Sequence, residues 1–299
     1  MASATVKLIG CLERSKVFCG ERAQARMSSR PMEEDIDSPK QGSGAEQLGF
    51  PVRRVPLDAP WDWLSRGWGD LCAVPSLSLA YGACFSVVAW VILFVLSFLE
   101  ATSLVPVLAA GFLLVAPLLA AGLYEMSRRL EKGERVTMRD VFAACAPASG
   151  RLGFFGVVLF LAFFAWVELA FLLLTLFLGG AGAPDPSEFV HTPLFTNAGL
   201  ALLFTGTLTG AILAAIVFSI CSVAVPLLLV KNTDAVTAIA TSVRAVRLNT
   251  GTMLLWAALI AGYMVLGTWT LFVGLVVIFP LLGHATWHAF RALVEVDGI

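Results

Sequence analysis

The sequence has few charged residues, and the long stretches without them decide its class. Only 14% of the 299 residues are Asp, Glu, Lys or Arg, and 58% are hydrophobic. An average soluble domain carries roughly 25% charged residues. Between Leu71 and Tyr124 the only charged residue is Glu100. Because such a stretch is stable in a lipid bilayer and not in water, the sequence predicts a polytopic membrane protein.

Motifs for several common chemistries are also absent. The sequence contains no glycine-rich nucleotide loop, no H-E-x-x-H, no Ser-His-Asp set and no C-x-x-C. Its six cysteines have no zinc-ligand spacing, so we interpret them as small apolar side chains. The net charge of −1 gives no electrostatic reason for a nucleic-acid partner. We therefore expect a protein without a cofactor and without nucleic acid, and more readily a non-enzyme than an enzyme.

Residues 1–50 differ in composition from the rest. They contain Lys, Arg, Ser, Gly and an acidic cluster at residues 32–37, but no apolar core of the length that a secretory signal needs. This pattern predicts a disordered cytoplasmic tail. A start at Met27 or Met32 would be consistent with the same composition, which leaves open whether residues 1–31 are translated. The membrane domain is predicted to occupy residues 51–299.

Long apolar runs predict an all-α membrane helix bundle with six transmembrane helices in three hairpins. A helix rises 1.5 Å per residue, so about 20 residues cross the hydrocarbon core. The last run, residues 251–295, is too long for one crossing, and we divide it near Gly267-Thr268-Trp269. The other four predicted spans are Leu77–Leu99, Leu104–Tyr124, Leu152–Leu178 and Asn197–Val230.

Lys and Arg predict the orientation of these spans. Beyond residue 50, every Lys and Arg lies before the first span, between the second and third, between the fourth and fifth, or after the sixth. The positive-inside rule then places both termini in the cytoplasm. A short amphipathic segment precedes each outward span, starting near Asp58, Thr137 and Thr233, and is predicted to lie at the membrane interface. Together with a Pro-Leu-Leu in each returning span, this predicts three pseudo-repeats, at about 58–130, 136–231 and 233–295.

Three segments resemble a family of uncharacterised bacterial integral membrane proteins that is classified as a domain of unknown function. They are W-D-W-L-S-R-G-W (61–68) with L-S-L-A-Y-G (77–82), D-A-V-T-A-I (234–239) with S-V-R-A-V (242–246), and F-P-L-L-G-H-A-T-W-H-A-F-R (279–291). The resemblance covers about residues 50–295. Some members are labelled cytochrome c oxidase subunit I. The resemblance implies a bacterial inner membrane and supplies no catalytic residues.

Two histidines are candidate ligands. His284 and His288 are four residues apart, so both lie on one face of the last predicted helix. Two imidazoles placed in this way can bind a transition metal, and a single one can ligate haem or relay protons. The alternative is that they are packing residues near the membrane interface, because no other histidine lies in a predicted span.

Glu168 is the one acidic residue well inside a predicted span. An intramembrane carboxylate is a candidate functional group and is expected to face protein rather than lipid. It lies about 24 Å along its helix from the inner end, which is too far from His284 for a shared ligand site.

The sequence does not determine a biochemical role, and three classes remain. We rank first a non-enzymatic accessory or assembly component of an inner-membrane complex, which would contact the lipid bilayer and other membrane subunits. The second class is a small-solute or ion transporter, for which an internal repeat and Glu168 are mild support. The third is a haem- or metal-binding redox protein related to respiratory oxidase function that uses His284 and His288.

Overall fold

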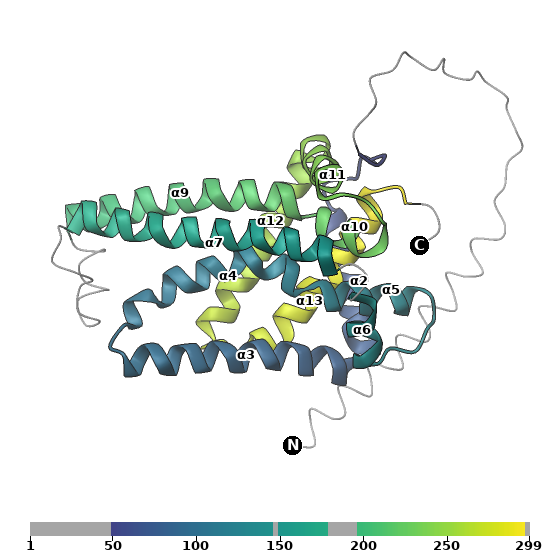
Figure 1. Cartoon of the computed structure of the whole chain (residues 1–299), viewed down its shortest axis with the longest axis horizontal. Helices are drawn as coiled ribbons and strands as arrows, with labels where there is room; N and C mark the ends of the chain where they lie inside the picture. Colours follow the sequence, from purple (N-terminus) through teal and green to yellow (C-terminus); the bar gives the residue numbers. More distant parts are fainter. Residues whose placement is uncertain (1–48, 146–148, 179–195, 297–299) are drawn as a thin grey trace, which may run out of the picture. The chain divides into compact units, whose positions relative to one another are not determined.

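The protein is an α-helical bundle, shown as a computed structural model in Figure 1. Residues 49–145, 149–178 and 196–296 are described, and all of them belong to one compact unit, Leu48–Ile299. The predicted tail, residues 1–50, lies almost wholly outside this range. The helices are α2 (Ala59–Ala73), α3 (Pro75–Phe98), α4 (Val105–Leu119), α5 (Ala121–Glu131), α6 (Met138–Cys145), α7 (Ser149–Leu178), α9 (Asn197–Cys221), α10 (Ala224–Val230), α11 (Ala235–Leu248), α12 (Thr250–Trp269) and α13 (Leu275–Leu293).

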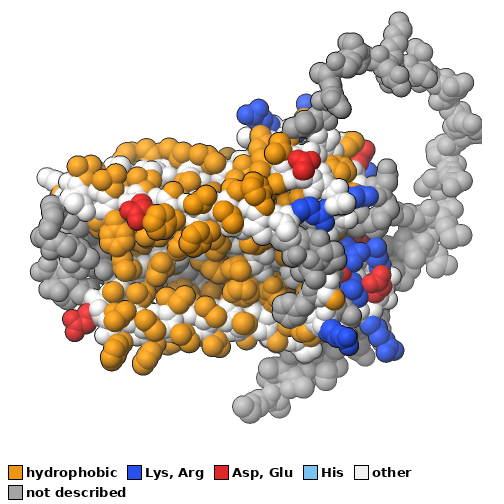
Figure 2. Space-filling model, viewed as in Figure 1, with side chains coloured by type: hydrophobic (Ala, Val, Ile, Leu, Met, Phe, Trp, Pro, Cys, Tyr) orange, Lys and Arg blue, Asp and Glu red, His pale blue; other side chains and the backbone are white. Residues whose placement is uncertain are grey.

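Figure 1 shows α3, α4, α7 and α9 running lengthwise through the bundle, while α2, α5, α6 and α11 gather at one end. Lys and Arg side chains collect at this same end, and the rest of the visible face is mostly hydrophobic, with acidic side chains at two places towards the other end (Figure 2). We name this the charged end; it holds the basic residues 128, 129, 151, 231 and 291. The opposite, far end contains the connection from α3 to α4. The predicted all-α membrane bundle with short amphipathic helices is therefore confirmed.

Two of the returning helices are interrupted beside their prolines. The helix after Val105 stops at Leu119, two residues beyond Pro117, and α5 restarts at Ala121. At this break the amide of Leu123 bonds to Ala120, and the Tyr81 hydroxyl donates to the carbonyl of Leu119 at 2.6 Å. Because a carbonyl in lipid needs a partner, the neighbouring helix α3 makes the interruption tolerable.

The second interruption is satisfied in the same way. The amide of Val223, between α9 and α10, donates to the hydroxyl of Ser242 in α11 at 3.2 Å. The third return, α13, passes through Pro280 without an interruption. The three returns thus differ, although each contains a Pro-Leu-Leu. The pseudo-repeat itself stays a prediction.

The α12–α13 hairpin reaches only part of the way to the far end. Its turn is fixed beside Ser86, whose hydroxyl donates to the carbonyl of Phe272 at 2.9 Å. From Ser86 to Phe98, α3 continues for about 18 Å beyond that level. In Figure 1, α12 and α13 cross the lengthwise helices at a steep angle. The predicted division of residues 251–295 is correct, and the turn lies at residues 270–274.

The last helix, α13, differs from the other predicted spans. Among the described residues, five helices are long and apolar enough to cross a membrane, and α13 is not one of them; the five are 75–98, 105–131, 150–177, 197–230 and 250–269. The physical reason lies in the second half of α13, where His284, His288 and Arg291 replace apolar residues. That half is enclosed by protein and not by lipid. In α13 as a whole, 13 of the 19 residues are buried.

Candidate functional site

The second half of α13 packs against α2, α3 and α5 at the charged end. Two glycines permit the close approach. A Cβ at Gly67 of α2 would come within 2.6 Å of the Ala285 nitrogen, and one at Gly82 of α3 would collide with the carbonyl of Val276. Any larger residue there would push α13 away. The sequence F-P-L-L-G-H-A-T-W-H therefore enters a slot formed by three other helices.

His284 is fully buried in this slot, between two serine hydroxyls. Its Nε2 lies 2.9 Å from Ser78 Oγ of α3, and its Nδ1 lies 2.7 Å from Ser127 Oγ of α5. A neutral imidazole donates from one nitrogen and accepts at the other, so one serine accepts while the other donates. The three side chains form a hydrogen-bonded chain that joins α3, α13 and α5.

The geometry of this hydrogen-bonded set of side chains limits the chemistry that it can perform. A serine 2.7 Å from a histidine nitrogen has the spacing of a nucleophile and its general base. However, Ser78, Ser127 and His284 all have 0% exposure, so a substrate cannot reach the hydroxyls. The arrangement can pass a proton between the two serines, and it can hold three helices together.

The remaining polar residues of α13 bind other helices. His288 Nε2 lies 2.9 Å from Asp70 Oδ2 in α2. Trp287 Nε1 and Arg291 Nε both donate to the Glu131 carboxylate at 3.2 Å. One turn of α13 is thus linked to α2 and α5 by separate contacts. The sequence gives no signal for these partners, because Asp70 and Glu131 are far from α13 along the chain.

The metal prediction concerns His284 and His288. The structure places both on one side of α13, as expected, but gives each its own hydrogen-bond partners. No three His, Cys, Asp or Glu side chains gather as a ligand set among the described residues. At His284 a metal ion or haem would have to replace Ser78 or Ser127, whereas the contact of His288 with Asp70 involves only its Nε2. Ligation by this pair stays a prediction.

A buried ion cluster lies next to this slot. Glu125 of α5 has 1% exposure and accepts two hydrogen bonds from Arg128, both at 2.7 Å, and one from Arg129 at 2.8 Å. Both carboxylate oxygens are therefore paired with arginine donors in a buried position. Spacings of three and four residues on a helix are a signal that sequence analysis could have used.

Glu168 lies elsewhere, on α7, and its side chain is exposed on this chain. It is about 25 Å along the helix from Arg151 at the charged end. Its neighbours on the same helical face, Phe164 and Leu172, are 53% and 61% exposed. The inward face of α7 is instead made by Phe155, Leu159 and similar residues. The structure therefore does not give Glu168 the protein environment that the sequence led us to expect.

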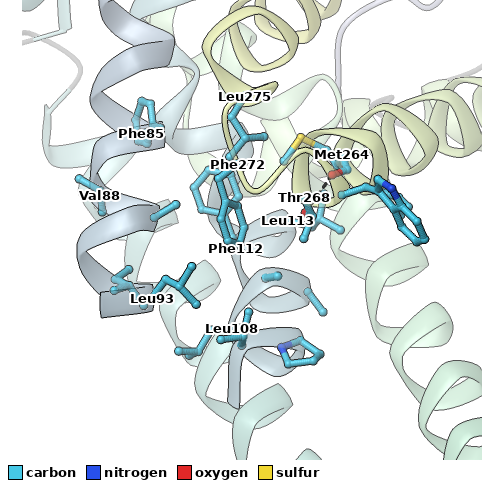
Figure 3. Close-up of a pocket in the computed structure, with 18 of the residues that line it drawn as sticks. Phe85, Val88, Leu93, Leu108, Phe112, Leu113, Met264, Thr268, Phe272 and Leu275 are labelled. Carbon is cyan, nitrogen blue, oxygen red and sulfur yellow. Dashed lines mark hydrogen bonds between the residues drawn. The ribbon is translucent and has the colours of Figure 1, made fainter. Parts of the chain in front are cut away.

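A cavity of about 440 Å³ lies between the far halves of α3 and α4 and the α12–α13 turn. Figure 3 shows side chains from these elements around it. Among its lining residues, Thr268 is the one with a hydroxyl, and that hydroxyl donates to the carbonyl of Met264 at 3.0 Å. The cavity exists because the hairpin stops beside Ser86 while α3 and α4 continue. Sequence analysis did not find it.

Comparison with known proteins agrees with this architecture. Residues 104–230 match the model of the family described as predicted integral membrane protein (DUF2189). The match runs from α4 to α10 and confirms the resemblance to an integral membrane family of unknown function. The three segments that carry the resemblance in the sequence lie outside this range. No curated protein and no solved structure shows a significant match to the chain. The role must therefore be argued from the geometry.

Proposed function

We propose that this integral membrane protein is a non-enzymatic accessory component that binds another membrane protein through α7. The observation that carries the proposal is the exposed side chain of Glu168 within a membrane span. Its exposed neighbours Leu161, Phe164, Phe171 and Leu172 are apolar, as lipid requires. Only Glu168 does not suit a lipid-facing position on this helix face.

The energetic argument is one of solvation. An ionised carboxylate at the centre of a helix in lipid costs about 2.5–3.5 kcal/mol on insertion scales, and more in simulations. Glu168 is too far from both helix ends to reach the interface, since Arg151 lies about 25 Å away and Phe177 about 13 Å away. Within the described part of the chain it has no hydrogen bond or ion pair. A partner helix with a donor at the same depth would satisfy it.

We also propose that the protein lies in a bacterial inner membrane with its charged end in the cytoplasm. Support comes from the collection of Lys and Arg at one end of the bundle (Figure 2) and from the positive-inside rule. Both termini would then be cytoplasmic.

Site-specific photocrosslinking in native membranes tests the accessory role. A crosslinking amino acid at Phe164 should capture a membrane protein, whereas one at Phe204, which is exposed on α9, should not capture the same partner. Glu168→Leu should abolish the adduct at Phe164, and Glu168→Gln should weaken it. An identical adduct in Glu168→Leu would contradict the proposal. If the purified protein alone drives solute uptake into liposomes, the transporter class takes its place.

A further inference from the structure

We propose that the cavity between α3, α4 and the α12–α13 turn binds one acyl chain of a membrane phospholipid. The inference is independent of the accessory role, because no residue of the cavity belongs to α7. Its volume of about 440 Å³ falls within the range of ligand pockets, about 300–1,000 Å³. The choice of ligand follows from the dimensions, lining, opening and floor of the cavity.

The length of the cavity matches one leaflet of a bilayer. On α3 its lining runs from Phe85 to Leu96, which is about 16 Å along the helix axis. Half of the hydrocarbon core is about 15 Å thick. The cavity begins at the level of the hairpin turn and extends towards the far end of α3. An extended acyl chain that lies parallel to the helices would therefore fill it from one end to the other.

The lining excludes a polar ligand. Apart from Thr268, the Trp269 indole and the Met264 thioether, every side chain around the cavity is aliphatic or a phenyl ring. The Thr268 hydroxyl already donates within its own helix. A headgroup, nucleotide or ion placed here would lose its hydration without gaining partners, whereas a hydrocarbon chain loses nothing.

The cavity opens onto the lipid-facing surface. Val88, Ile92 and Trp269 line it and are also exposed, by 49%, 44% and 84%. The exposed surface continues along α3 through Phe94 and Phe98. A chain can therefore enter sideways from the bilayer while its headgroup stays at the membrane surface near the far end.

The floor of the cavity is held in place. Leu271 and Phe272 have φ values of 52° and 64°, a left-handed conformation that side chains other than glycine rarely adopt. Such strain persists only where surrounding contacts fix it. Here Ser86 bonds to the Phe272 carbonyl, and the Gly274 amide donates to Thr270 Oγ1 at 2.9 Å. The fixed turn keeps Phe272 at the floor, so the cavity does not collapse.

Native mass spectrometry of the purified full-length chain tests the proposal with two cavity-filling variants and a matched control. Ala89 and Ala109 line the cavity, and Ala211 is exposed on α9 outside it. After delipidation with detergent, the wild type and Ala211→Phe should each retain one phospholipid. Ala89→Phe and Ala109→Phe should each retain severalfold less while remaining monodisperse and helical.

Photolabelling gives a second readout that does not depend on the variants. In nanodiscs with a phospholipid that carries a diazirine on its acyl chain, the peptide Met264–Leu275 should be labelled severalfold more than the exposed face of α9. Equal labelling of both segments would show ordinary surrounding lipid and overturn the proposal. A wild type that retains no lipid, or filled variants that retain as much as Ala211→Phe, would overturn it as well.

Discussion

His284 illustrates how a polar residue can be kept in an apolar bundle. Both of its ring nitrogens are bonded to serines, so burial leaves no unsatisfied group. Each contact taken alone is worth about 1 kcal/mol, but an unsatisfied partner costs about 1–3 kcal/mol. The residue is therefore stabilising only as long as Ser78 and Ser127 are both in place.

Replacing His284 by alanine should reveal this dependence. The change leaves two buried hydroxyls without partners and a cavity beside them, and it should destabilise the protein by about 2–5 kcal/mol. Thermal unfolding in mild detergent measures the loss. The triple variant Ser78→Ala/His284→Leu/Ser127→Ala removes all the polar groups and should recover most of the stability. If the triple variant is as unstable as His284→Ala, the network does more than satisfy buried groups.

At the residue scale, sequence analysis singled out His284 and His288 but not their hydrogen-bond partners. The serines bonded to His284 lie 206 and 157 positions away along the chain, and each is an unremarkable serine within or beside an apolar run. Only the approach of α13 to α3 and α5 brings them together. For Glu168 the sequence showed that the residue lies within a span. It could not show that the side chain is exposed, because exposure depends on which face of α7 packs against the other helices.

At the scale of whole helices, the closest contacts lie where a glycine has no side chain. The contact between α3 and α13 is close because Gly82 carries no Cβ, and Val276 and Pro280 occupy that space. Sequence analysis located both helices but could not assign this contact, since any of the glycines in the spans could have served. Proline disrupts a helix, which accounts for the interruption after Pro117, whereas no feature of the sequence points to Tyr81 as the partner of the freed carbonyl.

Gly82→Ala should separate α3 from α13. The added methyl group collides with the Val276 carbonyl, which is backbone and cannot move aside alone, so we expect a loss of about 1–3 kcal/mol. Gly153→Ala on α7 is the matched control, because a Cβ there meets nothing within 4 Å. In thermal unfolding this control should be neutral or slightly stabilising, since alanine favours a helix. Equal losses in both variants would contradict the close contact.

The start of α11 should respond to pH. Asp234 caps this helix, and hydrogen bonds from the hydroxyl and then the amide of Thr237 hold the pKa of its carboxyl below the usual value. Because the folded pKa is depressed, the stabilisation is present above the ordinary pKa of aspartate and is lost as the pH falls through the folded value. Hydrogen exchange of the first turn should therefore rise at acidic pH relative to Asp234→Asn, which caps without titrating. Identical pH profiles for the two proteins would rule out this role.

For the whole molecule, apolar runs and helix length sufficed to predict the all-α bundle and the ends of several long helices, but not the interruptions after Leu119 and Cys221. They could not determine how deep each helix lies. Residues 251–295 contain enough apolar residues for two crossings, and division into two helices is what the structure has. The depth of the hairpin depends on contacts such as Ser86 with Phe272, which join distant parts of the chain. The cavity follows from that depth and was therefore equally inaccessible to the sequence.

Cysteine accessibility can decide whether the α12–α13 hairpin ends within the membrane. In a cysteine-free background, Leu271→Cys should resist a membrane-impermeant maleimide applied to both faces, because the turn lies about 18 Å short of the far end of α3. Glu100→Cys, at the connection from α3 to α4, should be labelled readily. Leu271 is 60% exposed, so detergent should restore its labelling and show that lipid, not protein, protects it. If Leu271→Cys reacts in intact membranes as fast as Glu100→Cys, the hairpin completes its crossing and the bundle has six spans.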